Sequence, residues 1–198
     1  MIHFTDITGL ASSAVVMDAA LFMLPGVARL QRHHLALLAC AVAGAALIPF
    51  GGLPAAAYVR GVIGDLSISS LVLLVLGILR PMLGWHQPDT QSRFVLQLLI
   101  ALAAVGLYPM ALGIGLFDPY RLGYGNPWFM GALLTLALAA CFRHVYIVAL
   151  CIALAVFAWS AGWYESDNLW DYLLDPLVAI YAIGALAKRA VQMPQKQR

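Results

Sequence analysis

The sequence predicts an all-α membrane protein, a bundle of six or seven transmembrane helices joined by short loops. Of the 198 residues, 63% are hydrophobic and only 10% are charged, whereas soluble domains carry about 25% charged residues. The mean hydropathy is +0.89. Apolar stretches close to the roughly 20 residues that a spanning helix needs follow one another along the chain.

The same composition excludes several classes of protein. A chain this apolar cannot cover itself with polar surface in water, which excludes a soluble enzyme. Disorder requires low hydrophobicity and high charge, which excludes a disordered regulator. The formal net charge is only +2, so we expect no nucleic-acid partner. We expect residues 1–198 to form a single integral membrane domain.

Seven apolar segments are expected to be helical. The first, 9–28, contains Asp18 and is either a span or a helix lying on the membrane surface; the distribution of positive charge favours a span. Asn126 before Pro127 is typical of an N-cap followed by a proline in the first turn. Pro109 is expected to kink its helix. The other six segments are 34–50, 56–79, 94–116, 127–141, 144–162 and 168–187.

Lysine and arginine residues predict the orientation, because short cytoplasmic loops carry an excess of them. If all seven segments cross, Arg60 and Arg121 fall on one side. We therefore expect a multi-pass inner-membrane protein with a cytoplasmic C-terminus, and an N-terminus outside if the first segment spans. The larger group, on the cytoplasmic side, is Arg29, Arg32, Arg80, Arg93, Arg143, Lys188, Arg189, Lys196 and Arg198.

Acidic and aromatic residues are interleaved in two loops of the opposite, outer side, 117–128 and 162–172. Tryptophan and tyrosine favour the membrane interface, which accounts for the aromatic residues alone. Their mixture with charges suits a site that binds a lipid headgroup, a sugar or a cation. The candidate ligand-binding residues are Asp118, Tyr120, Arg121, Trp163, Glu165, Asp167, Asn168, Asp171 and Asp175.

The start of the last segment reads D-N-x-x-D-x-x-x-D, from Asp167 to Asp175. On one helix, Asp167, Asp171 and Asp175 would share a face, and Mg²⁺ or Mn²⁺ would hold such carboxylates together. The spacing resembles the N-D-x-x-D-x-x-x-D motif of intramembrane prenyltransferases, with the first two residues exchanged. That resemblance implies a magnesium diphosphate site.

Two other interpretations of these acids stay open. Asp167 or Asn168 can cap a helix, Asp171 suits a positive first turn, and Asp175 before Pro176 can form a second cap. Alternatively, the acids form an ion pair with Arg60 or Arg121.

Apart from the acids of the last segment, three charged residues fall inside expected spans: Asp18, Arg60 and Asp65. Charges within a membrane are costly and often functional. Arg60 and Asp65 stand about 140° apart around a continuous helix, so we expect Asp65 to meet another helix instead. A pairing of Asp18 or Asp65 with Arg60 would form a structural clamp or part of a proton or cation path.

Three functions follow from these patterns, and whether the protein is an enzyme stays open. The leading hypothesis is a transport or envelope-assembly component with an acidic, aromatic pocket on its outer face. The second is a membrane enzyme that acts on a lipid-linked phosphate through an aspartate-bound metal. The third is a non-catalytic accessory or immunity-type subunit. Membrane lipids are the expected partners, together with a larger membrane complex in the third case.

Overall fold

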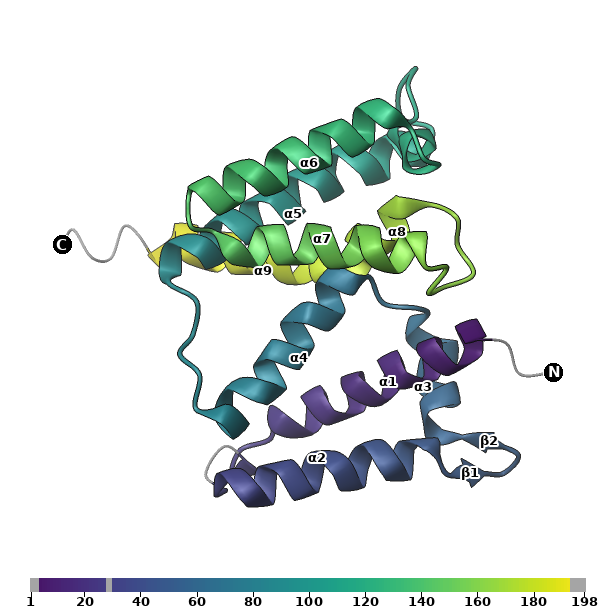
Figure 1. Cartoon of the computed structure of the whole chain (residues 1–198), viewed down its shortest axis with the longest axis vertical. Coiled ribbons are helices and arrows are strands. Elements are labelled where there is room, and N and C mark those ends of the chain that lie inside the picture. Colours follow the sequence, from purple (N-terminus) through teal and green to yellow (C-terminus); the bar gives the residue numbers. More distant parts are fainter. Residues whose placement is uncertain (1–3, 28–29, 193–198) are drawn as a thin grey trace. The chain divides into compact units, whose positions relative to one another are not determined.

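The computed structural model describes residues 4–27 and 30–192, and these are helical apart from loops and one short hairpin (Figure 1). The all-α prediction is confirmed. Ala28 of the first expected span, and Arg29, Lys196 and Arg198 of the charge distribution, lie outside the described residues. The chain divides into two compact units, which are considered separately below.

The first unit comprises the described part of 1–66 together with 70–87 and 161–165. Its helix α1 packs against α2 and α3, and small side chains at the contact, Ala14, Ala46 and Ala56, allow the backbones to approach closely. Its elements are α1 (Phe4–Phe22), α2 (Arg32–Leu47), β1 (Pro49–Phe50), β2 (Leu53–Pro54), α3 (Ala55–Ile63) and most of α4 (Ile68–Leu83).

The β1–β2 hairpin was not predicted. It turns on Gly51 and Gly52, whose φ angles are 65° and 100°, and two successive residues with positive φ are what a two-residue type I′ hairpin turn requires. The pair Gly-Gly between short apolar runs is the signal that could have revealed it.

The second unit comprises 67–69, 88–160 and the described part of 166–198. Helix α5 lies against α9 and α7, and α6 lies against α7. The buried stripe Leu96, Ile100 and Ala104 repeats at the spacing of one helix face. The elements are α5 (Thr90–Ala111), the 3₁₀ helix η2 (Pro119–Gly123), α6 (Pro127–Phe142), α7 (Tyr146–Ser160), α8 (Leu169–Leu173) and α9 (Pro176–Gln192).

Side-chain caps define where two of these helices begin. Asn126 accepts hydrogen bonds from the Trp128 and Phe129 N–H groups, and Pro127 opens α6, which confirms the predicted cap. Asp89 caps α5 by accepting from the Ser92 N–H at 2.9 Å. Hydrogen bonding from Ser92 lowers the pKa of the Asp89 carboxyl below its ordinary value.

Two of the expected spans are each divided in two, which corrects the sequence prediction. Segment 56–79 separates into α3 and α4 at Gly64, whose φ of 73° ends the first helix. Segment 168–187 separates into α8 and α9 at Leu174, which is extended (φ −144°, ψ 134°). Proline disfavours a helical conformation in the residue before it, and Pro176 follows Asp175.

The first expected span is also shifted. Helix α1 begins at Phe4 and ends at Phe22, so Asp18 lies near its C-terminal end and not in its middle.

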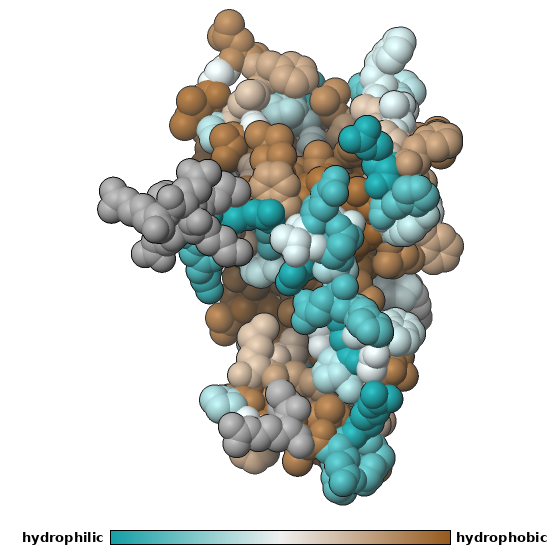
Figure 2. Space-filling view, turned by 90° about the vertical axis from the view of Figure 1, so that its left-hand side faces the viewer, coloured by the Kyte–Doolittle hydropathy of each residue, from teal (hydrophilic) through white to brown (hydrophobic). Residues whose placement is uncertain are grey.

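Two described helices are long and apolar enough to cross a membrane by length and composition, Thr5–Phe22 and Thr90–Ala111. The apolar helices 32–47, 68–83, 127–142 and 146–160 are shorter. Many apolar side chains nevertheless face outward. Figure 2 shows hydrophobic residues over broad areas of the face drawn, and α6 exposes Leu134, Leu138 and Phe142 along one side.

Candidate functional site

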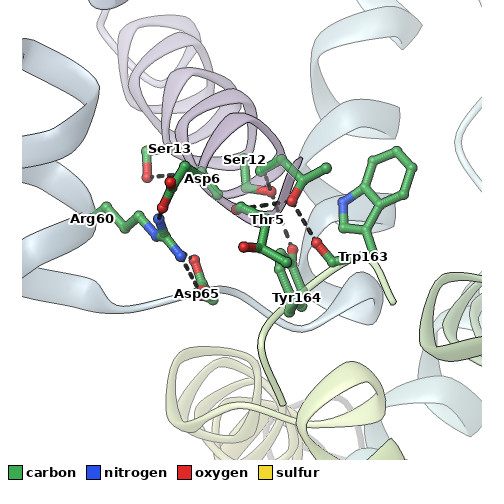
Figure 3. Close-up of polar contacts among 10 residues, drawn as sticks. Thr5, Asp6, Ser12, Ser13, Arg60, Asp65, Trp163 and Tyr164 are labelled. Atoms are coloured by element: carbon green, nitrogen blue, oxygen red, sulfur yellow. Dashed lines mark hydrogen bonds and ion pairs between the residues drawn. The ribbon is translucent and has the colours of Figure 1, made fainter. Parts of the chain in front are cut away.

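The first unit contains a cluster of charges around Arg60, drawn in Figure 3. The Arg60 guanidinium donates two hydrogen bonds to Asp65, from Nε to Oδ1 at 2.7 Å and from Nη2 to Oδ2 at 2.9 Å. Asp6 of α1 lies on its other side, 3.6 Å from Nη1. We call Arg60, Asp65 and Asp6 the arginine cluster. The arginine side chain is only 21% exposed, so the pairing is partly shielded from water.

This contact corrects the prediction that Arg60 and Asp65 do not face each other. The prediction assumed one continuous helix. Because α3 ends at Ile63 and Gly64 adopts a positive φ, the chain turns and Asp65 folds back onto Arg60. The pairing of Asp65 with Arg60 is therefore present, and it is a clamp between α3 and the turn that follows it.

Gly9 makes room for the arginine cluster on α1. A Cβ atom at this position would overlap the Arg60 guanidinium and approach Asp65 Oδ1 to 2.8 Å. The guanidinium therefore lies directly over the α1 backbone. Only glycine allows this close approach without displacing the arginine.

Hydroxyl groups hold the adjacent side of α1. Thr8 Oγ1 donates to the Trp163 main-chain oxygen. Ser12 Oγ lies 3.1 Å from the Tyr164 hydroxyl, and Figure 3 labels both of these side chains. Ser12 and Ser13 also donate to main-chain oxygens one turn earlier, at Thr8 and Gly9. Back-bonding of this kind satisfies buried hydroxyls within a helix. The N-terminal half of α1 is thus fastened by polar contacts.

In the second unit, the two loops predicted to form the outer site do meet. The Tyr120 hydroxyl donates to Asp171, with Oδ2 at 2.8 Å and Oδ1 at 3.0 Å, and Ser166 Oγ donates to the same carboxylate. Asn168 Nδ2 donates to the Tyr120 main-chain oxygen at 2.9 Å. We call Tyr120, Ser166, Asn168 and Asp171 the loop frame.

The loop frame is closely packed. Asn168 is fully buried and also caps α8, with its Oδ1 accepting from the Trp170 N–H at 2.9 Å, which confirms the predicted capping role. A Cβ at Gly123 would overlap the Asn168 side chain, so glycine is required in η2. Burial, followed by the hydrogen bond to Asp171 and its charge, raises the pKa of the Tyr120 phenol above its ordinary value.

Asp175 lies outside the loop frame and joins two other elements. Its Oδ2 accepts from both the N–H (2.9 Å) and the Oγ (2.7 Å) of Ser67. Its Oδ1 accepts from the Val178 N–H at 2.9 Å in the first turn of α9. This confirms the predicted cap formed by Asp175 and Pro176. The same carboxylate also binds the residue that precedes α4.

The three spaced aspartates do not share a helix face, which corrects the geometry expected for a metal site. Asp171 lies in α8, while Asp167 precedes α8 and Asp175 precedes α9. The extended backbone at Leu174 breaks the spacing on which the prediction depended. Within residues 4–27 and 30–192, no group of three or more His, Cys, Asp or Glu side chains is placed to hold a metal ion.

The remaining predicted site residues are divided between the two units. Trp163 and Glu165 belong to the first unit, where Glu165 is exposed. In the second unit, Asp118 caps η2 by accepting from the Tyr120 N–H at 2.9 Å. Arg121 and Asp167 are exposed there, and Arg121 makes no ion pair with any residue that the structure describes.

Asp18 is paired with neither Arg60 nor any other described cation. Its side chain in α1 is buried, with the residue 6% exposed, and the Oδ1 atom has no hydrogen-bond partner among the described residues. The predicted pairing of Asp18 with Arg60 is therefore absent, because Arg60 is paired with Asp65 and Asp6 instead.

Sequence reasoning did not single out Asp6, Thr8, Ser12, Tyr164 or Ser166 as partners. Thr8 and Ser12 stand one turn apart in a mostly apolar helix, and this spacing could have indicated a polar contact on one side of α1. Nothing local to Asp6 or Ser166 indicates their partners, because those contacts depend on folding.

Comparison of the chain with protein-family models, curated proteins and solved structures finds no match.

Proposed function

We propose that the chain is a small multi-pass inner-membrane protein with six or seven crossings and a cytoplasmic C-terminus. The exposed apolar sides of its helices support this proposal. Helix α7, with only 15 residues, would measure about 22 Å, shorter than the roughly 30 Å hydrocarbon core. It nevertheless exposes Leu150, Leu154 and Phe157, and lipid would cover these side chains.

Within the membrane, the protein would act as a transport or envelope-assembly component that recognises a lipid headgroup, a sugar or a cation. The observation that carries this proposal is the loop frame. Its hydrogen bonds join the α5–α6 connection to α8 and to the residues just before it. Arg121 of the connection and Asp167 before α8 both stay exposed. A rigid frame that presents charges reduces the entropy lost when a polar ligand binds.

The test is native mass spectrometry of the detergent-purified full chain, with and without a chelator. We expect a bound lipid, sugar or cation in the wild type. Arg121→Gln or Asp167→Asn should reduce its occupancy by about tenfold, which corresponds to about 1.4 kcal/mol. Arg143→Gln is the matched control, because Arg143 is also exposed and lies at the opposite end of α6.

The outcomes of this mass spectrometry experiment distinguish the proposed functions. A wild-type protein free of any bound species, or equal occupancy in all variants, would contradict recognition at the loop frame. A cation that is lost on chelation but whose binding depends on neither Arg121 nor Asp167 would instead favour the metal-dependent enzyme. The geometry offers that enzyme little support, because Asp171 and Asp175 are hydrogen-bonded to separate partners.

The accessory subunit is a second candidate, and one observation favours it. Gly131, Thr135 and Ala139 follow at four-residue intervals on the exposed side of α6. Small residues at this spacing promote helix association in membranes. Copurification of a larger membrane protein, lost when Gly131 is replaced by Leu, would support this role over ligand recognition.

A further inference from the structure

The α5–α6 connection exposes an unusual concentration of apolar side chains. Immediately after α5, Leu112 is 82% exposed and Ile114 is 70% exposed. Leu116 and Phe117 follow and are also exposed. Gly113 and Gly115 adopt positive φ angles of 90° and 130°, which lets this short loop turn while its large side chains point outward. Water would be an unfavourable environment for these groups.

Polar and amphipathic groups follow in the same connection. Arg121 is exposed in η2. Trp128, in the first turn of α6, is 85% exposed. Tryptophan favours the interface between headgroups and acyl chains, and arginine favours phosphate. The connection therefore combines, within one short stretch, groups suited to the acyl region, to the phosphate and to the interface between them.

Neighbouring acids do not neutralise Arg121. The Asp118 carboxylate accepts from the Tyr120 N–H, and Asp171 is held by the Tyr120 hydroxyl and Ser166. Arg121 has no ion pair within the described part of the chain. A negative group from outside the protein is the remaining complement to its charge.

We propose that this connection is a lipid-inserting loop, in which Leu112–Phe117 enter the acyl region and Arg121 binds the phosphate of an anionic phospholipid. This inference rests on the proposed function and names its ligand class. It also places the loop inside the leaflet instead of in water. The rigid attachment of η2 to Asn168 and Asp171 keeps Arg121 at a fixed position behind the inserted residues.

The experiment uses the full chain reconstituted in vesicles, with a fluorescent NBD label at Leu116→Cys. The native cysteines Cys40, Cys141 and Cys151 are replaced by Ala, and thermal unfolding checks that the background still folds. His86→Cys, exposed in the loop between α4 and α5, carries the label as a control. We expect nitroxide-labelled lipid to quench the label at position 116, and aqueous iodide to quench it at position 86.

Lipid preference is measured with the same labelled protein. Nitroxide-labelled phosphatidylglycerol should quench the label at 116 about three- to fivefold more effectively than labelled phosphatidylcholine, in line with one basic group near an anionic surface. Arg121→Gln should abolish this preference, whereas Arg143→Gln should retain it. High salt should weaken the preference, because it screens the charge.

Two results would overturn the proposal. Iodide quenching at position 116 would place the loop in water. Equal quenching by the two lipids, or a preference that survives Arg121→Gln, would rule out an anionic headgroup as the ligand of Arg121. Either result leaves the proposed function standing if native mass spectrometry still finds a species whose binding depends on Arg121 and Asp167. The proposed function fails separately if no such species is bound.

Discussion

Asp175 is a single carboxylate that serves two elements. It binds the first turn of α9 through Oδ1, and it accepts two hydrogen bonds from Ser67 through Oδ2. The residue is only 6% exposed, so removal of the carboxylate would leave buried donors without partners. Unsatisfied buried donors are costly, more so when the lost partner is charged.

We therefore predict that Asp175→Ala lowers the free energy of unfolding by about 2–4 kcal/mol, from the lost cap and the lost charged hydrogen bonds. Asp175→Asn should cost about half as much, because an amide oxygen can still accept from Val178. Thermal unfolding in detergent measures both.

Asp167→Ala is the control, because Asp167 is exposed and the hydrogen bond that it accepts from Trp159 uses its main-chain oxygen. It should change stability by no more than about 0.5 kcal/mol. Equal stability of the Asp175 and Asp167 variants would show that the double cap contributes nothing.

At the scale of elements, α1 is held by the arginine cluster above Gly9. A glycine inside a helix is usually less stable than alanine by about 0.5–1 kcal/mol. At Gly9 we expect the opposite sign, because a methyl group would displace the Arg60 guanidinium from Asp65. Gly9→Ala should therefore destabilise the protein by about 1–2 kcal/mol, as expected for overpacking.

Gly44→Ala in α2 provides the matched control, since a Cβ there meets nothing within 4 Å. It should leave stability unchanged or raise it slightly. The double variant Gly9→Ala with Arg60→Gln should be less destabilised than the sum of the two single variants. Simple additivity in detergent unfolding experiments would argue against the contact between α1 and Arg60.

At the scale of the whole molecule, the proposed topology places the two ends of α7 on opposite sides of the membrane. Arg143 precedes this helix and Asp167 follows it. In intact cells, an impermeant thiol reagent should label Asp167→Cys, and it should label Arg143→Cys only after the membrane is opened. Both positions are exposed, so poor reactivity through burial is not expected.

Labelling of both positions from one side would contradict a crossing by α7. A tag at the N-terminus, detected from outside in intact cells, would distinguish seven crossings from six. The physical basis of the prediction is the excess of positive charge expected on cytoplasmic loops.

Local sequence signals correctly predicted the all-α fold class and several helix caps. Asn126, Asn168 and Asp175 cap helices as their neighbours indicated, because a cap depends on backbone groups only two or three residues away. The break at Gly64 was missed, and the break at Leu174 was indicated only by the alternative second cap at Asp175. An apolar run looks continuous in sequence even where a glycine or a residue ahead of proline interrupts the helix.

By itself, the sequence determined an apolar, all-helical chain, because that class depends on composition. It also determined where several helices begin, because a short polar capping motif depends only on near neighbours. Tertiary structure decided which carboxylate meets which donor. Tyr120 and Asp171 are far apart in the chain, as are Ser67 and Asp175. Such pairs depend on how helices pack, and burial makes the pairing obligatory because an unsatisfied charge in a low-dielectric interior is costly.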